Sequence, residues 1–279
     1  MADVKKANTG AKPQSGQSKS TNGFWVNLAI VIACIVVGQL IYHFVLGSPS
    51  NFQDAEKHKP LPGNIFGNMY LGGIIVPFLI ASFLVVLAFT IERAITILNA
   101  KGKFSGSELV RKVQYHLANK NVDAAIAECD KQRGSVGNVM RSGLVKYKEM
   151  MTNTELTTDE KIIAIHKEVE EATTLEVPML EKNLVFLSTL TSAATLLGLV
   201  GTVLGMIKSF AGMATAGAPD ATALAAGISE ALYNTCLGIS TSFVAMIAYN
   251  FFTTIIDGIN YSIDESGFTL TQSFAINHK

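Results

Sequence analysis

Two stretches in the C-terminal third decide the fold: LLGLVGTVLGM at residues 196–206 and GISEALYNTCLG at residues 227–238. Each stretch lies inside a long apolar segment, and the two segments together run from residue 184 to residue 256. Only the short polar loop TAGAPD at residues 215–220 separates them. Because about 20 apolar residues suffice to cross a bilayer as a helix, we predict a transmembrane helical hairpin here.

The second apolar segment carries a single carboxylate, Glu230. A charged side chain at the centre of a bilayer costs at least about 2.5 kcal/mol, so an ionisable group within a span indicates a functional site. The alternative interpretation is a structural carboxyl group that is hydrogen-bonded across a helix interface. We favour the functional interpretation and expect the rest of the chain to position Glu230.

The composition indicates a membrane protein. Of 279 residues, 49% are hydrophobic and only 16% are charged, and the mean hydropathy is +0.33. The 22 basic and 22 acidic residues balance, and no cluster of Lys, Arg and aromatic residues predicts nucleic-acid binding. The three cysteines are scattered and are interpreted as small hydrophobic residues. The sequence shows no metal-ligand spacing and no glycine-rich phosphate loop, so we predict neither an enzyme nor a cofactor.

Residues 24–46 form a further apolar segment without a charged residue. A secretory signal peptide is the competing interpretation, but its apolar core normally has only about 7 to 15 residues. We therefore predict a retained first span, preceded by a disordered, basic tail at residues 1–23.

The second span is predicted at residues 69–91, where Gly72, Gly73 and Pro77 are tolerated because neighbouring helices satisfy the freed backbone groups. Basic residues outnumber acidic ones just after this span, which places that flank in the cytoplasm by the positive-inside rule. Two further spans then return the C-terminus to the cytoplasm as well.

Residues 92–182 are polar and carry helix signals throughout. Ser105 with Glu108, and Thr157 with Glu160, fit capping boxes. We predict helices at 107–119, 121–133 and 135–150, and a fourth helix that starts near Thr157, is kinked at Pro178 and continues into the third span.

These predictions define an all-α membrane protein with four transmembrane helices and a helical cytoplasmic domain between the second and third spans. The expected segments are a cytoplasmic tail (1–23), span 1 (24–46), a periplasmic loop (47–68), span 2 (69–91), the cytoplasmic domain (92–182), span 3 (183–214), a periplasmic loop (215–222), span 4 (223–256) and a cytoplasmic C-terminal tail (257–279).

The third span carries its hydroxyl groups in a single stripe. At 100° per residue, six small or hydroxyl-bearing residues fall within about 40° of the direction of Thr202. They are Ser188, Thr191, Thr195, Gly198, Thr202 and Ser209. Such residues allow close helix packing and interhelical hydrogen bonds, and they can also form the polar wall of a pore. Both interpretations can hold for one stripe.

In the fourth span the residues nearest in direction to Glu230 are small or polar. Gly227, Asn234, Gly238, Thr241 and Ala245 lie within about 80° of it. Glu230 is therefore predicted to face a helix interface or a pore rather than lipid. Lys208, near the end of the third span, is interpreted as a snorkelling membrane anchor.

The two quoted stretches resemble the signature of the MotA/TolQ/ExbB proton channel family, most closely its ExbB and TolQ branch. The resemblance implies that Glu230 is the pore glutamate and that Thr202 and Thr235 are the threonines of the proton pathway. Thr235 lies about 140° from Glu230, so we expect it to face a neighbouring subunit's Thr202. We expect the other polar residues of the two spans to line the pore: Ser188, Thr191, Thr195, Ser209, Asn234 and Thr241.

The resemblance also implies partners and a location. A homopentamer in the bacterial inner membrane would surround two helices of an ExbD/TolR-like single-span protein, each with an aspartate, and proton flow would energise a TonB/TolA-like protein.

The chain departs from the ExbB pattern in two places. Ala194 and Thr195 stand where many relatives have a proline, and the usual ExbB plan has three spans rather than four. Four spans resemble MotA, which usually lacks a glutamate at the position of Glu230. A motility stator, a stand-alone solute transporter and a structural scaffold are the alternative functions, and the choice between proton and sodium stays open.

Overall fold

The computed structural model describes residues 20–54, 59–215 and 221–277, and this part of the chain is built from helices without a named strand. Within these described residues, four helices are long and apolar enough to cross a membrane, which confirms the all-α, four-span fold class. Most of the expected N-terminal tail, and residues 216–220 of the expected loop between spans 3 and 4, lie outside the described residues.

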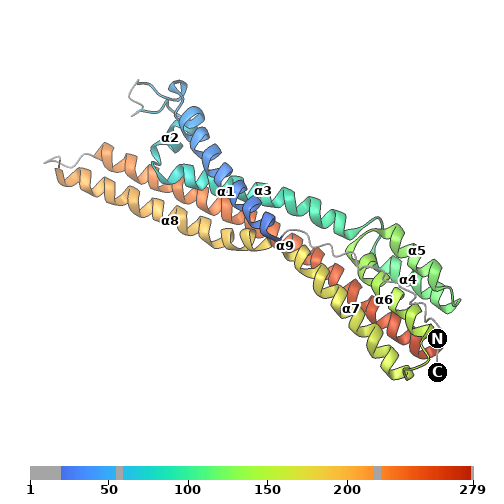
Figure 1. The fold of residues 1–279 in the computed structure, drawn as a ribbon. Coiled ribbons are helices and arrows are strands. Elements are labelled where there is room, and N and C mark those ends of the chain that lie inside the picture. Colours follow the sequence, from blue (N-terminus) through green and yellow to red (C-terminus); the bar gives the residue numbers. More distant parts are fainter. Residues whose placement is uncertain (1–19, 55–58, 216–220, 278–279) are drawn as a thin grey trace, which may run out of the picture.

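A long helical hairpin forms the axis of the molecule (Figure 1). It consists of α8 (Leu184–Thr215) and α9 (Ala221–Asn277), which lie side by side. We call the end of the hairpin next to residues 216–220 the loop side, and the end that packs on α4 to α7 the domain side. Glu230 lies near the loop side, in the part of α9 that pairs with α8.

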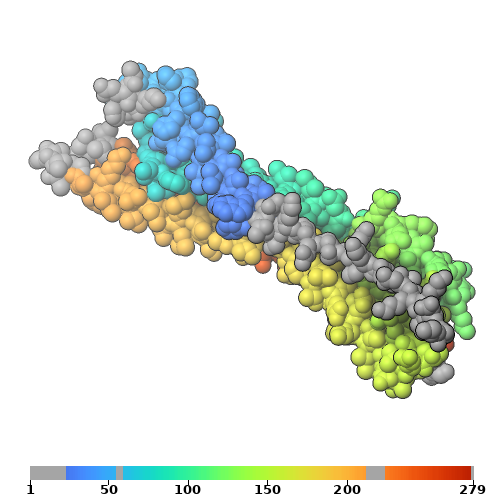
Figure 2. All heavy atoms as spheres, viewed as in Figure 1, coloured from blue at the N-terminus to red at the C-terminus, as the bar shows by residue number. Residues whose placement is uncertain are grey.

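The first span, α1 (Ser20–Leu40), continues as a π-helical turn η1 (Ile41–Leu46). It lies on the outside of the molecule and crosses α3 (Figure 2). A Cβ added to Gly38 would lie 2.8 Å from the Pro77 carbonyl oxygen, so only glycine allows this crossing. A short 3₁₀ turn, η2 (Pro49–Asn51), follows.

The second span is interrupted near its start. A short helix, α2 (Ile65–Leu71), is followed by α3 (Ile75–Lys101). Gly73, in the turn between them, has φ +74°, a conformation that strongly favours glycine. The helix expected at residues 69–91 therefore consists of two pieces, and α3 extends ten residues past residue 91 without a break.

Four helices follow in the segment predicted to be a helical domain: α4 (Gly106–Ala118), α5 (Val122–Gln132), α6 (Ser135–Thr152) and α7 (Thr158–Glu181). Their predicted positions are confirmed. The Thr157 hydroxyl and the Glu160 carboxylate form the expected capping box at the start of α7. The Ser105 hydroxyl accepts a hydrogen bond from the Glu108 backbone N–H at 3.3 Å.

The prediction that this fourth helix continues into span 3 is wrong. The structure ends α7 at Glu181 and begins α8 at Leu184, because Asn183 adopts a left-handed conformation with φ +66°. The buried guanidinium of Arg93 donates a hydrogen bond to the Leu180 carbonyl oxygen at 3.2 Å. Arg93 thus satisfies a helix-end carbonyl that would otherwise lack a partner, which stabilises the break.

The segment expected as a tail after residue 256 is the continuation of α9. The apolar residues on one face of this segment pack against α4, α6 and α7 and are almost fully buried. The buried residues include Ile259, Ile263, Leu270 and Phe274. Because this spacing places them on one helical face, α9 continues straight from the membrane into the core of the helical domain.

Candidate functional site

The α8–α9 interface is built on glycines that bring the two backbones into contact. A Cβ on Gly198 would lie 3.1 Å from the Gly238 Cα atom. Nearer the loop side, a Cβ on Gly205 would lie 3.2 Å from the Gly227 carbonyl oxygen. Small residues at such positions let membrane helices approach closely enough for short polar side chains to meet across the interface.

Thr202 and Thr235 meet across this interface. Their hydroxyl groups are in direct hydrogen-bond contact within one subunit. The Thr202 hydroxyl also lies 3.2 Å from the Gly198 carbonyl oxygen and 3.4 Å from the Ala231 carbonyl oxygen. The prediction that Thr235 faces a neighbouring subunit's Thr202 is therefore wrong, because the close approach of α8 and α9 brings the two together in the same chain.

Glu230 is paired with Lys208. The Lys208 Nζ atom lies 3.1 Å from a carboxylate oxygen of Glu230. The Glu230 side chain is only 11% exposed, whereas that of Lys208 is 72% exposed. The interpretation of Lys208 as only a membrane anchor is thus wrong. The sequence contained a usable signal, since both residues lie about two turns from the loop side of an antiparallel hairpin and therefore at similar depth.

The interrupted second span closes another side of this site. The Asn234 side-chain amide donates a hydrogen bond to the Gly72 carbonyl oxygen at 3.1 Å. A Cβ added to Gly73 would lie 3.1 Å from a carboxylate oxygen of Glu230. The α2–α3 turn therefore contacts both polar side chains, a contact that the sequence did not indicate. Asn234 is 1% exposed, so it is packed between helices in the subunit.

The remaining residues that were predicted to line the pore divide into two groups. Ser188 and Thr195 are exposed, and Thr191 is half-buried. Ser209 and Thr241 are buried and donate hydrogen bonds to carbonyl oxygens of their own helices, Gly205 at 2.9 Å and Leu237 at 2.8 Å. The buried pair fits the helix-packing interpretation of the stripe, and the exposed residues are free to face a neighbour or a pore.

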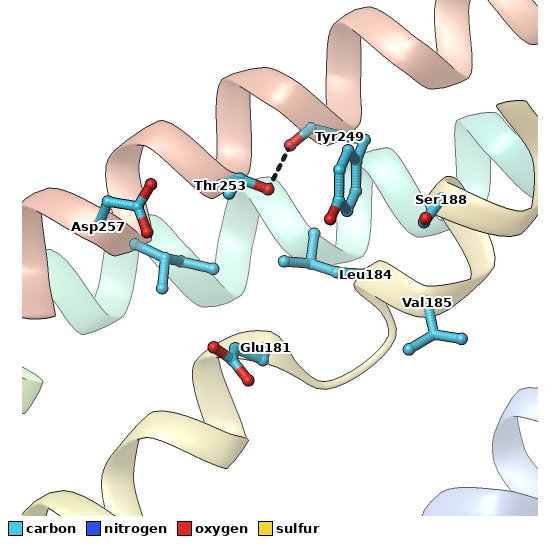
Figure 3. A pocket seen from close by; sticks show the side chains of 8 residues that line it. Glu181, Leu184, Val185, Ser188, Tyr249, Thr253 and Asp257 are labelled. Carbon is cyan, nitrogen blue, oxygen red and sulfur yellow. Dashed lines mark hydrogen bonds between the residues drawn. The ribbon is translucent and has the colours of Figure 1, made fainter.

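A cavity with both polar and apolar walls lies at the break between α7 and α8 (Figure 3). Its volume is about 310 Å³, and Glu181 and Asp257 contribute carboxylates to its wall. Ser188, the domain-side end of the hydroxyl stripe, also lines it. The other lining residues are Leu184, Val185, Tyr249, Thr253 and Ile256. The cavity thus places Ser188, at one end of the hydroxyl stripe, in the same wall as the two carboxylates at the domain side of the spans.

Together these features define a multi-pass helical membrane protein with polar residues concentrated between its third and fourth spans. Residues 132–265 match the model of the MotA/TolQ/ExbB proton channel family, and this segment holds both glycine-rich stretches and Glu230. No curated protein matches the chain.

Proposed function

We propose that this chain is the proton-channel subunit of an ExbB/TolQ-like motor in a bacterial inner membrane. With an ExbD/TolR-like partner it would couple the proton motive force to a TonB/TolA-like protein for outer-membrane transport or integrity. The observation that carries the proposal is the placement of Glu230, Thr202 and Thr235 between two spans, within the segment that matches the proton channel family. In the apolar part of α8 and α9, Glu230 is the one carboxylate.

In the proposed mechanism, a proton neutralises an aspartate of the partner helix, which then leaves its polar contacts and moves along the ring of subunits. Thr202 and Thr235 each offer one hydroxyl donor and acceptor along this path. Glu230 supplies either an exchangeable proton or a fixed negative field that attracts cations. The acidic cavity with Ser188 would connect the path to the cytoplasm.

The energy available to such a motor follows from the membrane potential. One elementary charge that crosses 100 mV releases about 2.3 kcal/mol. Several protons per step would therefore supply enough work to rotate a partner within a ring of subunits.

The exposed surfaces of α8 and α9 support assembly. Large apolar side chains such as Leu199, Val203 and Phe243 are more than half exposed in the single chain. In a homopentamer these faces would contact neighbouring subunits, the partner helices and lipid. The N-terminus and C-terminus would both lie in the cytoplasm, on the side of α4 to α7.

A stator subunit of a motility motor is the second candidate, and α1 favours it. This additional span gives the chain four apolar helices, as in the MotA branch. The two candidates share the proton pathway and differ in the load that they drive.

Proton flux in liposomes tests the proposal. The chain is reconstituted alone and together with a single-span partner that carries the membrane aspartate, and flux is followed with an internal pH dye under an imposed potential. We expect flux only from the complex, and in buffers with and without sodium. Flux that requires sodium would contradict proton coupling, and net transport of a solute by the chain alone would favour the transporter alternative.

A further inference from the structure

The apolar parts of α8 and α9 contain one cation and one anion, and the structure pairs them. Lys208 is the single charged residue of α8, and Glu230 is the single charged residue of α9 before Asp257. Their side chains meet at 3.1 Å. The two spans are therefore neutral as a unit, and each charge depends on the other for compensation.

The surroundings of Glu230 provide little other support for a negative charge. Within the described part of the chain, the hydrogen-bond donor recorded for its carboxylate is the Lys208 ammonium group. The Asn234 amide, one turn further along α9, donates to the Gly72 carbonyl oxygen instead. Tyr42 of η1 also interacts electrostatically with Glu230. Loss of that cation would therefore leave a carboxylate that is only 11% exposed without a compensating charge.

Lys208 is able to leave Glu230 without repacking the protein. Its side chain is 72% exposed on a flexible four-carbon stem, so rotation about side-chain bonds breaks the ion pair. The pair formed by Arg93 and Glu92 provides a contrast. Arg93 is 2% exposed and also donates a hydrogen bond to the Leu180 carbonyl oxygen, so that pair is fixed in place.

From this geometry we propose that Lys208 is a releasable counter-ion that holds Glu230 ionised in the resting subunit. Glu230 then exchanges a proton only when Lys208 has moved away from it. Resting on the proposed function of Glu230, this inference assigns the regulation of the same site. In a channel subunit, the consequence is that Glu230 takes up no proton until an anionic group of another chain attracts Lys208.

Carbodiimide labelling of the full chain in liposomes tests the proposal. Dicyclohexylcarbodiimide partitions into membranes and reacts with protonated carboxyl groups. The carboxyl proton moves to a carbodiimide nitrogen, the carboxyl oxygen bonds to the central carbon, and rearrangement gives a stable N-acylurea without a leaving group. Mass spectrometry of peptides then gives the labelled fraction at Glu230 from pH 6 to pH 9, and Glu230→Gln identifies the signal.

We expect Lys208→Gln to increase the labelling of Glu230 at pH 7 by about tenfold and to move the half-labelling point to higher pH, because the compensating charge is lost. Lys208→Arg keeps the charge and is expected to label like the wild-type chain. Lys208→Met, which suits an apolar span, serves as a second neutral variant if Lys208→Gln does not fold. Labelling of Glu181, at the distant cavity, is the internal reference and should not change.

Equal labelling of Glu230 in the wild-type chain and a folded neutral variant would overturn the proposal, and so would increased labelling in Lys208→Arg. The result is independent of the flux assay. If the wild-type complex carries no protons but the labelling shift is present, the proposed function fails while the counter-ion role stands. If flux is present and the shift is absent, only the counter-ion role fails.

Discussion

The loop-side half of the α8–α9 hairpin and the domain-side part of α9 belong to one pair of helices but are packed in opposite ways. Between Gly198 and Gly238 the backbones touch, and polar side chains such as Thr202 and Thr235 fill what space is left. Beyond Asp257, α9 buries large apolar side chains against α4, α6 and α7. One helix therefore has two kinds of interface along its length.

The difference reflects the two environments. In lipid, burying apolar side chains between helices gives little advantage, so close backbone contact and polar pairs hold helices together. In water, the burial of apolar area supplies the stability, at roughly 25 cal/mol per Å². The polar contact between Thr202 and Thr235, which the proposed pathway requires, lies in the first kind of interface. We therefore assign function to the loop-side half and positioning to the domain-side part.

The largest expected effect is on the domain-side core. Phe274 is fully buried and packs edge-on against Tyr147, with 4.9 Å between the ring centroids. Phe274→Ala should lower the free energy of unfolding of the domain by about 3–5 kcal/mol, because the cavity cannot close completely. Thermal unfolding in detergent, followed by circular dichroism, measures the loss.

Phe268→Ala is the matched control for this prediction. Phe268 lies on the same helix but is 67% exposed, so its truncation should change the unfolding temperature little. Similar losses for both variants would mean that the domain-side part of α9 does not depend on this core.

A smaller loss is expected from an added methyl group between the backbones. A Cβ at Gly238 would lie 2.6 Å from the Ala194 carbonyl oxygen, an atom that side-chain rotation cannot move. Gly238→Ala should cost about 1–3 kcal/mol and separate Thr202 from Thr235. Disulfide trapping between cysteines introduced at the two threonine positions measures that separation.

Gly258→Ala tests whether the effect belongs to the loop-side interface. A Cβ at Gly258 meets nothing within 4 Å, so the substitution should leave stability and trapping unchanged or slightly improve helix stability. If Gly238→Ala were as well tolerated as Gly258→Ala, the two parts of α9 would not differ in packing.

The sequence predicted the features of the fold that depend on local signals and missed those that depend on tertiary contacts. Apolar length predicted the four spans, and the capping residues Ser105 and Thr157 predicted where α4 and α7 begin, because these signals are local. The break at Asn183 could not be predicted, since it depends on Arg93, ninety positions away in the chain.

At the site, a rotation of 100° per residue predicted the directions in which Glu230 and Thr235 point from their helix. It did not predict which residues they contact. The contact between Thr202 and Thr235 depends on how closely α8 and α9 approach, and the contact of Gly73 with Glu230 depends on the turn between α2 and α3. Both are tertiary features that one helix cannot reveal.

The smallest expected effect concerns the exposed start of α7. Hydrogen bonds from the Thr157 backbone N–H and hydroxyl hold the pKa of Glu160 below its usual value. The stabilisation is therefore complete above the pKa of the unfolded chain and is lost as the pH falls through the lower pKa of the folded state. Glu160→Gln should remove this part of the acid sensitivity, measured as unfolding temperature against pH. An unchanged pH profile would exclude a role for the capping box in acid stability.

The central claim is that the loop-side half of the hairpin carries protons through Glu230. Its most direct test is proton flux through the complex with the single-span partner, measured for the wild-type chain, Glu230→Gln and, as a matched neutralisation in α6, Glu149→Gln. We predict that Glu230→Gln abolishes flux in a correctly assembled complex and that Glu149→Gln, an exposed residue of the helical domain, does not. Undiminished flux in the assembled Glu230→Gln complex would contradict the account and reduce Glu230 to a packing role.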